Sequence, residues 1–106
     1  MAGVAYVDSS ALLKLAVAEP ETSALEADLA GRDGLVASRL AALECRRAAR
    51  RTSNKRVLQA VDEVLDAIHL ATALSIDEPV LDVITYDRRL AEAAEAAGLR
   101  VVQPGR

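Results

Sequence analysis

The sequence is poor in the residues on which several common kinds of site depend. Its 106 residues include no Trp or Phe, two Tyr, one His and one Cys. One cysteine cannot form an internal disulfide, and neither one cysteine nor one histidine can build the usual zinc sites. So few aromatic rings also argue against recognition of a single strand by base stacking. The lack of a disulfide is typical of a protein of the reducing cytoplasm.

Targeting and membrane signals are missing as well. The first ten residues, MAGVAYVDSS, contain no basic residue and reach an acid after seven positions, so we do not expect a secretory signal. No apolar run approaches the ~18 residues that a membrane-spanning helix requires. These features predict a cytoplasmic protein that has no membrane partner.

What is present is typical of one folded domain with an aliphatic core. The composition is 52% hydrophobic and 27% charged, which excludes a disordered chain, and the length suffices for a single core. The net charge of −3 hides a local excess of positive charge, because residues 45–56 (CRRAARRTSNKR) contain basic residues and no acid. Such a basic face suits RNA phosphates, an acidic partner segment or simple solvation.

Hydrophobic patterns alternate between short apolar runs and helical stripes. The short runs predict strands at residues 4–7, 35–37, 83–86 and 100–103. Helical spacing and capping residues predict helices at residues 9–18, 22–30, 39–51, 55–74 and 88–97. This order of elements predicts an α/β fold with a central parallel sheet and helices on both faces.

Two aspartates stand where predicted strands end and predicted helices begin. Asp8 follows the run VAYV, and Asp87 follows the run VITY. In an open parallel sheet, ligands bind beyond the carboxyl ends of the strands, so both acids are candidates for a site there. The alternative for each is a structural role, because aspartate is a favoured helix N-cap that stabilises a helix by ~0.5–2 kcal/mol.

Two further acids occupy positions where a carboxylate is unexpected. Glu44, in SRLAALECRRAA, lies on an otherwise apolar row of its predicted helix, and its alternative role is a pair with Arg47 that contributes only ~0.2–0.5 kcal/mol. Asp66, in VLDAIHLATAL, has mostly apolar neighbours. We expect apolar surroundings for it, so that it needs a cation or a partner such as His69.

If the four acids converge, their mutual repulsion requires a positive charge among them. Mg²⁺ or Mn²⁺ is the natural choice, because these ions prefer carboxylate and water oxygens. Ions in such a cluster stabilise the attacking and leaving oxygens of a phosphoryl displacement, which suggests phosphodiester hydrolysis. A receiver domain would need an acid pair near the first strand and a late lysine, and a haloacid-type phosphatase would need an acid where Ser10 stands.

Four segments, YVDSSALLKL, SRLAALE, DAIHLATAL and ITYDRRLAEAAEAAGL, follow one another along nearly the whole chain. In this order they resemble the PIN-domain ribonucleases, and most closely the VapC toxins of bacterial toxin–antitoxin pairs. The resemblance implies a single three-layer PIN-like domain over residues 1–106. It also implies a Mg²⁺- or Mn²⁺-dependent endoribonuclease that cuts RNA, inhibits translation and is held inactive by a VapB-like antitoxin.

The same resemblance assigns the metal ligands to Asp8, Glu44, Asp66 and Asp87. It further implies that Ser9 and Thr85 position a water or a phosphate oxygen. The alternative is a PIN-like binding module that has lost catalysis but retains antitoxin or RNA binding.

One departure from the family concerns the length of the chain. Members usually carry an additional strand and helix between the segments that here meet directly at Leu65 and Asp66. The Leu- and Ala-rich helices also offer more apolar face than one small core needs, which predicts a homodimer.

Overall fold

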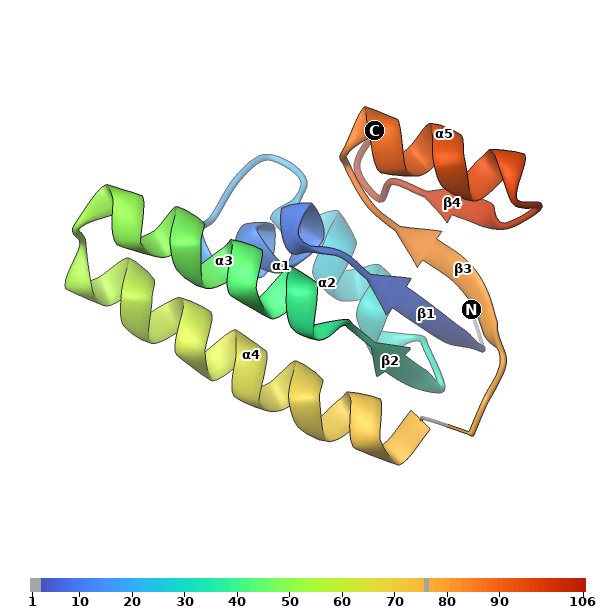
Figure 1. Cartoon of the computed structure of the whole chain (residues 1–106), viewed down its shortest axis with the longest axis horizontal. Coiled ribbons are helices and arrows are strands. Elements are labelled where there is room, and N and C mark those ends of the chain that lie inside the picture. Colours follow the sequence, from blue (N-terminus) through green and yellow to red (C-terminus); the bar gives the residue numbers. More distant parts are fainter. Residues whose placement is uncertain (1–2, 76) are drawn as a thin grey trace.

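The computed structural model describes residues 3–75 and 77–106. Strands and helices in these ranges follow one another in the predicted order (Figure 1). The strands are β1 (Val4–Val7), β2 (Gly34–Val36), β3 (Val80–Ile84) and β4 (Arg100–Val102). The helices are α1 (Ser9–Ala16), α2 (Thr22–Ala30), α3 (Arg39–Thr52), α4 (Lys55–Ser75) and α5 (Arg88–Ala96).

The strands form one parallel sheet with the order β2-β1-β3-β4. The central strand β1 is buried at Val4, Ala5 and Val7, as expected for a short apolar run covered on both faces. Its neighbours come from distant parts of the chain, since Val7 pairs with Ile84. The prediction of an α/β fold with a parallel sheet is therefore confirmed.

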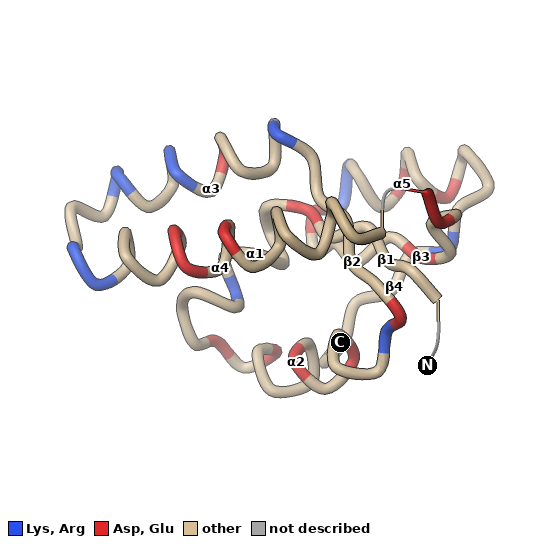
Figure 2. Tube along the Cα trace, turned by 90° about the horizontal axis from the view of Figure 1, so that it is seen from below, with Lys and Arg blue, Asp and Glu red and all other residues tan. Residues whose placement is uncertain are grey.

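Helices cover both faces of this sheet. The connection from β1 to β2 runs toward one edge and the connection from β3 to β4 toward the other, so right-handed crossovers place their helices on opposite faces. Figure 2 shows α2 and α5 on opposite sides of the sheet. The buried core contains Leu12, Cys45, Leu65 and Ile84, among others. The three-layer arrangement is thus confirmed, and no helix of the described ranges is long and apolar enough to cross a membrane.

The predicted bounds are correct within one residue at most element ends, with two corrections. The helix predicted at residues 9–18 ends at Ala16, because Val17 is extended with φ −123° and ψ 119°. The strand predicted at residues 83–86 lies at Val80–Ile84. Its beginning was missed because Asp82 interrupts the apolar run; this carboxylate is buried and ion-paired with Arg32 and Arg100.

Helices α3 and α4 form a long antiparallel hairpin beside the sheet (Figure 1). Asn54 caps α4 with its Oδ1, which accepts hydrogen bonds from the backbone N–H groups of Arg56 and Val57. One uninterrupted helix of 21 residues then runs through the junction of residues 65 and 66. Its last turn packs so closely on β2 that a Cβ at Gly34 would lie 2.2 Å from the Oγ of Ser75. The end of α4 is therefore fixed against the edge strand.

Candidate active site

Asp8 lies between the end of β1 and the first turn of α1. Its Oδ1 accepts hydrogen bonds from Ser10 Oγ (2.7 Å) and from the backbone N–H of Ala11 (3.2 Å). Its Oδ2 accepts one from Thr85 Oγ1 (2.7 Å). The bond from Ala11 is the N-cap of α1, so the structural role kept as an alternative is present. Because two hydroxyl groups also hold the side chain and it is only 6% exposed, the carboxylate has one fixed orientation.

The same two hydroxyl groups tie the end of β3 to the end of β1. Thr85 Oγ1 accepts from the backbone N–H of Asp87 (3.0 Å), and Ser10 Oγ accepts from that of Tyr86 (2.8 Å). Thr85 is fully buried, so it cannot contact a phosphate oxygen as the family resemblance implied. It positions Asp8 instead.

Three of the four predicted ligands line one pocket of about 370 Å³ at this edge of the sheet: Asp8, Glu44 and Asp87. Asp87 Oδ1 accepts from the backbone N–H of Leu90 (3.0 Å) and so caps α5. Glu44 is exposed on α3, whose start is fixed by Ser38, the acceptor for the backbone N–H of Ala41. Ser9 also lines this pocket, and its role toward a water or a phosphate oxygen stays a prediction.

The negative charge of the pocket affects the pKa of the buried Cys45 thiol. Its Sγ donates to the backbone oxygen of Ser9 over 3.6 Å, which joins α3 to the start of α1. Burial, followed by the charges of Asp8 and Glu44, raises the pKa of the Cys45 thiol to about 11. Two carboxylates from separate elements therefore act on the same buried group.

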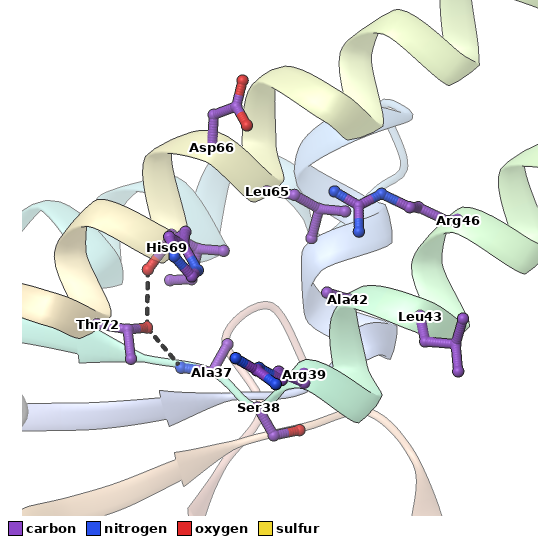
Figure 3. A pocket seen from close by; sticks show the side chains of 11 residues that line it. Ala37, Ser38, Arg39, Ala42, Leu43, Arg46, Leu65, Asp66, His69 and Thr72 are labelled. Carbon is purple, nitrogen blue, oxygen red and sulfur yellow. Dashed lines mark hydrogen bonds between the residues drawn. The ribbon is translucent and has the colours of Figure 1, made fainter.

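Asp66 lies outside this pocket. It lines a second hollow, of about 590 Å³, between α3 and α4 (Figure 3). The expectation of apolar surroundings is wrong, because Asp66 and His69 are both exposed, and no hydrogen bond joins them in the described part of the chain. The apolar neighbours in sequence, Leu65 and Ile68, are the ones that face the core, and each residue of a helix turns by about 100° from the preceding one.

The acids at this edge suit a hard divalent cation, although they do not converge on one point. Among the described residues, no three His, Cys, Asp or Glu side chains lie close enough together to hold a metal ion directly. Mg²⁺ usually keeps several waters and uses only one or two protein carboxylates. The oxygen donors of Asp8, Glu44 and Asp87 fit this type of binding.

Two features of the site were missed from the sequence. Ser10, two residues after Asp8, has no predicted role at the site, whereas in the structure its hydroxyl group donates to the Asp8 carboxylate. Arg89 also lines the acidic pocket, on the first turn of α5. A small hydroxyl residue two positions after an N-cap aspartate was the available signal for Ser10, and nothing in the sequence distinguishes Arg89 from its neighbour Arg88.

A parallel sheet in the order 2-1-3-4, with acids following its two central strands, defines a PIN-like α/β domain with an acidic pocket. Curated relatives agree with this class. Ribonuclease VapC46 of Mycobacterium tuberculosis (strain ATCC 25618 / H37Rv) is 36% identical over 125 aligned residues, covering 93% of this chain and 96% of that protein. Ribonuclease VapC35 of Mycobacterium tuberculosis (strain CDC 1551 / Oshkosh) is 37% identical over 130 residues, with 94% and 96% covered. The chain belongs to the VapC ribonuclease family.

A third relative is more distant. Ribonuclease VapC47 of Mycobacterium tuberculosis (strain CDC 1551 / Oshkosh) is 30% identical over 131 residues, with 94% of this chain and 96% of that protein covered. These alignments span more positions than the 106 residues of this chain, so the relatives contain residues without a counterpart here. No family model and no solved structure matches the chain.

Proposed function

We propose that this chain is a metal-dependent endoribonuclease, the toxin of a type II toxin–antitoxin pair, that hydrolyses RNA phosphodiester bonds in the pocket of Asp8, Glu44 and Asp87. The observation that carries the proposal is the fixed carboxylate of Asp8 at the sheet edge of a VapC-family fold. The hydrogen bonds from Ser10 and Thr85 fix its orientation, which a helix cap alone does not require. The acids around it supply the negative charge that a divalent cation offsets.

Each acidic side chain has a distinct role in this proposal. A bound Mg²⁺ or Mn²⁺ would stabilise the attacking and leaving oxygens of the displacement. Asp8 is the main ligand because Ser10 and Thr85 hold its two oxygens in place. Asp87 adds negative charge at the start of α5, and the exposed Glu44 accepts a hydrogen bond from the attacking water.

Asp66 stays a predicted ligand that has no place in this pocket. We propose that the additional residues of the relatives fall between Leu65 and Asp66, where this chain continues as one helix. Removing such a segment joins two helices and turns Asp66 toward solvent. The contribution of Asp66 to catalysis is then small, and an Asp66→Asn variant retains most of the activity.

The proposed partners are RNA, a VapB-like antitoxin and a second copy of the chain. Figure 2 shows Lys and Arg along α3 and its turn into α4. We assign the basic residues at the far end of this hairpin to an acidic segment of the antitoxin: Arg47, Arg50, Arg51, Lys55 and Arg56. A toxin of this kind acts on cytoplasmic RNA, so we place the protein in the cytoplasm.

The direct test incubates the purified chain with total RNA in the presence of Mn²⁺ or of EDTA. We expect fragments only with Mn²⁺, and no cleavage by an Asp8→Asn variant. Asparagine is as good an N-cap as aspartate, so this variant retains the helix cap while losing the charge. Asp77→Asn is the matched control, because Asp77 is exposed and lies outside the pocket. Cleavage by Asp8→Asn at the wild-type rate would refute the assignment.

Titration calorimetry distinguishes the proposed metal-dependent enzyme from the alternative, a PIN-like binding module that has lost catalysis. We expect saturable uptake of Mn²⁺ by the wild type and weaker uptake by Asp8→Asn. A wild type that takes up no Mn²⁺ but still binds RNA would favour the binding module.

A further inference from the structure

The hollow that Asp66 lines adjoins the acidic pocket. It has a volume of about 590 Å³, within the range of pockets that hold small ligands, and lies between α3 and α4. Ser38 lines both this hollow and the acidic pocket. A ligand that extends beyond the acidic pocket past Ser38 therefore enters the hollow. We call it the α3–α4 hollow.

Two arginines and one histidine line the α3–α4 hollow. Arg39 and Arg46 come from one face of α3, two turns and about 10 Å apart along its axis, and His69 comes from α4 (Figure 3). Arg39 has no ion pair in the ranges that the structure describes. Arg46 Nε lies 3.8 Å from Asp62 Oδ1, and both side chains are about half exposed or more, so this pair is weak.

The acid among the lining residues does not cancel this positive charge. Asp66 is the one acid among the residues that line the hollow, and two arginines, Arg39 and Arg46, stand against it (Figure 3). Two guanidinium groups thus face an open cavity beside a pocket that three carboxylates make negative. The two neighbouring cavities have opposite charge.

We propose that Arg39 and Arg46 bind backbone phosphates of the RNA strand whose cleaved bond lies in the acidic pocket, with His69 as a further hydrogen-bond donor. The inference rests on the proposed function. Arginine matches phosphate geometry with paired hydrogen bonds. RNA fits the hollow better than an acidic protein segment does, because only a substrate must come close to the carboxylates of the acidic pocket. Cations beside that pocket offset the repulsion between these carboxylates and the RNA phosphates. The strand crosses Ser38 from one cavity to the other.

The test measures binding without cleavage. The anisotropy of a fluorescein-labelled single-stranded RNA is recorded in EDTA at several salt concentrations, for the wild type and an Arg39→Gln/Arg46→Gln variant. The slope of log K against log salt is negative, and each lost phosphate contact reduces its magnitude by ~0.7. For two lost contacts we therefore expect a magnitude that is smaller by ~1.4, and weaker binding. Arg50→Gln/Arg51→Gln is the matched control with the same change of charge on the same helix, and its slope should stay near the wild-type value.

Two results would overturn the assignment of the α3–α4 hollow. One is wild-type affinity and slope in the Arg39/Arg46 variant, and the other is an equal decrease in both double variants, which indicates general attraction. Loss of binding to poly-glutamate with unchanged RNA binding would instead assign the hollow to an acidic partner. Cleavage with Mn²⁺ is measured separately: a wild type that binds RNA without cutting it refutes the proposed function, and the salt slope still decides whether the hollow binds phosphate.

Discussion

At the scale of single residues, Glu21 joins segments that are distant in the chain. Its carboxylate accepts hydrogen bonds from Lys14 Nζ (3.2 Å) and from Arg106 Nε (2.9 Å). Both cations also lie over the ring of Tyr86, at 4.8 and 5.1 Å from its centre. The hydrogen bonds from Arg106 and then Lys14 lower the pKa of Glu21 from 4.5 to about 2. This carboxylate therefore stays ionised under mildly acidic conditions.

The lowered pKa predicts a defined pH dependence of stability. The folded protein holds the Glu21 proton more weakly than the unfolded chain, so its contribution is present above pH ~4.5 and is lost as the pH falls toward ~2. We expect Glu21→Gln to be less stable than the wild type at pH 7, and the difference to vanish near pH 2. Urea unfolding at a series of pH values measures it. A difference that is the same at pH 7 and pH 2 would contradict this explanation.

The positions of Asp8 and Asp87 at the edge of the sheet could be predicted from the sequence, because each one follows an apolar run and precedes a helix. Glu44 was predictable because it interrupts an apolar row, and it does line the same pocket. The surroundings of Asp66 were not, because apolar neighbours in sequence do not become apolar neighbours in space on the outer face of a helix. The support from Thr85 depends on strand pairing across 77 residues, for which a single sequence contains no signal.

At the scale of elements, α5 begins at a residue with two proposed tasks. Asp87 caps this nine-residue helix and also lines the acidic pocket. A helix so short has little stability of its own, so its first turn depends on the cap and on packing against the sheet. Capping requires an oxygen acceptor, whereas the proposed site requires a negative charge. Substitutions therefore separate the two tasks.

Asp87→Asn and Asp87→Ala should differ in stability and agree in activity. Asparagine retains the cap, so we expect its free energy of unfolding to stay close to that of the wild type, while alanine lowers it by about 1 kcal/mol. Both variants lose the charge and should cleave RNA more slowly. Denaturant unfolding and RNA cleavage of the same preparations measure the two effects. Full activity in Asp87→Asn would remove Asp87 from the site and leave it as a cap alone.

The extent of α4 could be predicted from its sequence, but the position of its C-terminal end against the sheet could not. The stripe of Val61, Leu65 and Ile68 indicates one amphipathic helix, and these residues are buried as expected. The position of its end depends on close contact with β2 and with the residue that follows it, Ala37, whose backbone N–H donates to Thr72 Oγ1 over 3.0 Å. This contact joins residues 35 positions apart and has no local pattern.

At the scale of the whole molecule, large apolar side chains remain outside the core. Leu70 and Leu74 on the last turns of α4 are 63% and 79% exposed, and Leu40 on α3 is 63% exposed. Adjacent exposed leucines on one helix are unusual for a monomer, because apolar surface in water is unfavourable at about 25 cal/mol per Å². They support the proposed homodimer, with α4 at its interface.

The dimer prediction is tested by the mass of the protein in solution. We expect the wild type to sediment as a dimer at micromolar concentration and a Leu70→Glu/Leu74→Glu variant as a monomer, since four acids would face one another in the interface. Leu81→Glu, at a residue that is 53% exposed on β3, is the control and should stay dimeric. A wild type that is monomeric throughout the concentration range would exclude this interface.

The pairing of β1 with β3 also determines when activity can arise during synthesis. Asp8 leaves the ribosome before its partner Thr85, which follows 77 residues later. Pairings of such sequence separation form late, because the intervening chain must be ordered first. A nascent polypeptide that ends within α4 contains Asp8 and Glu44, yet it lacks Thr85, which positions Asp8, and Asp87, which lines their pocket. The proposed activity therefore cannot arise before β3 and the start of α5 have been synthesised.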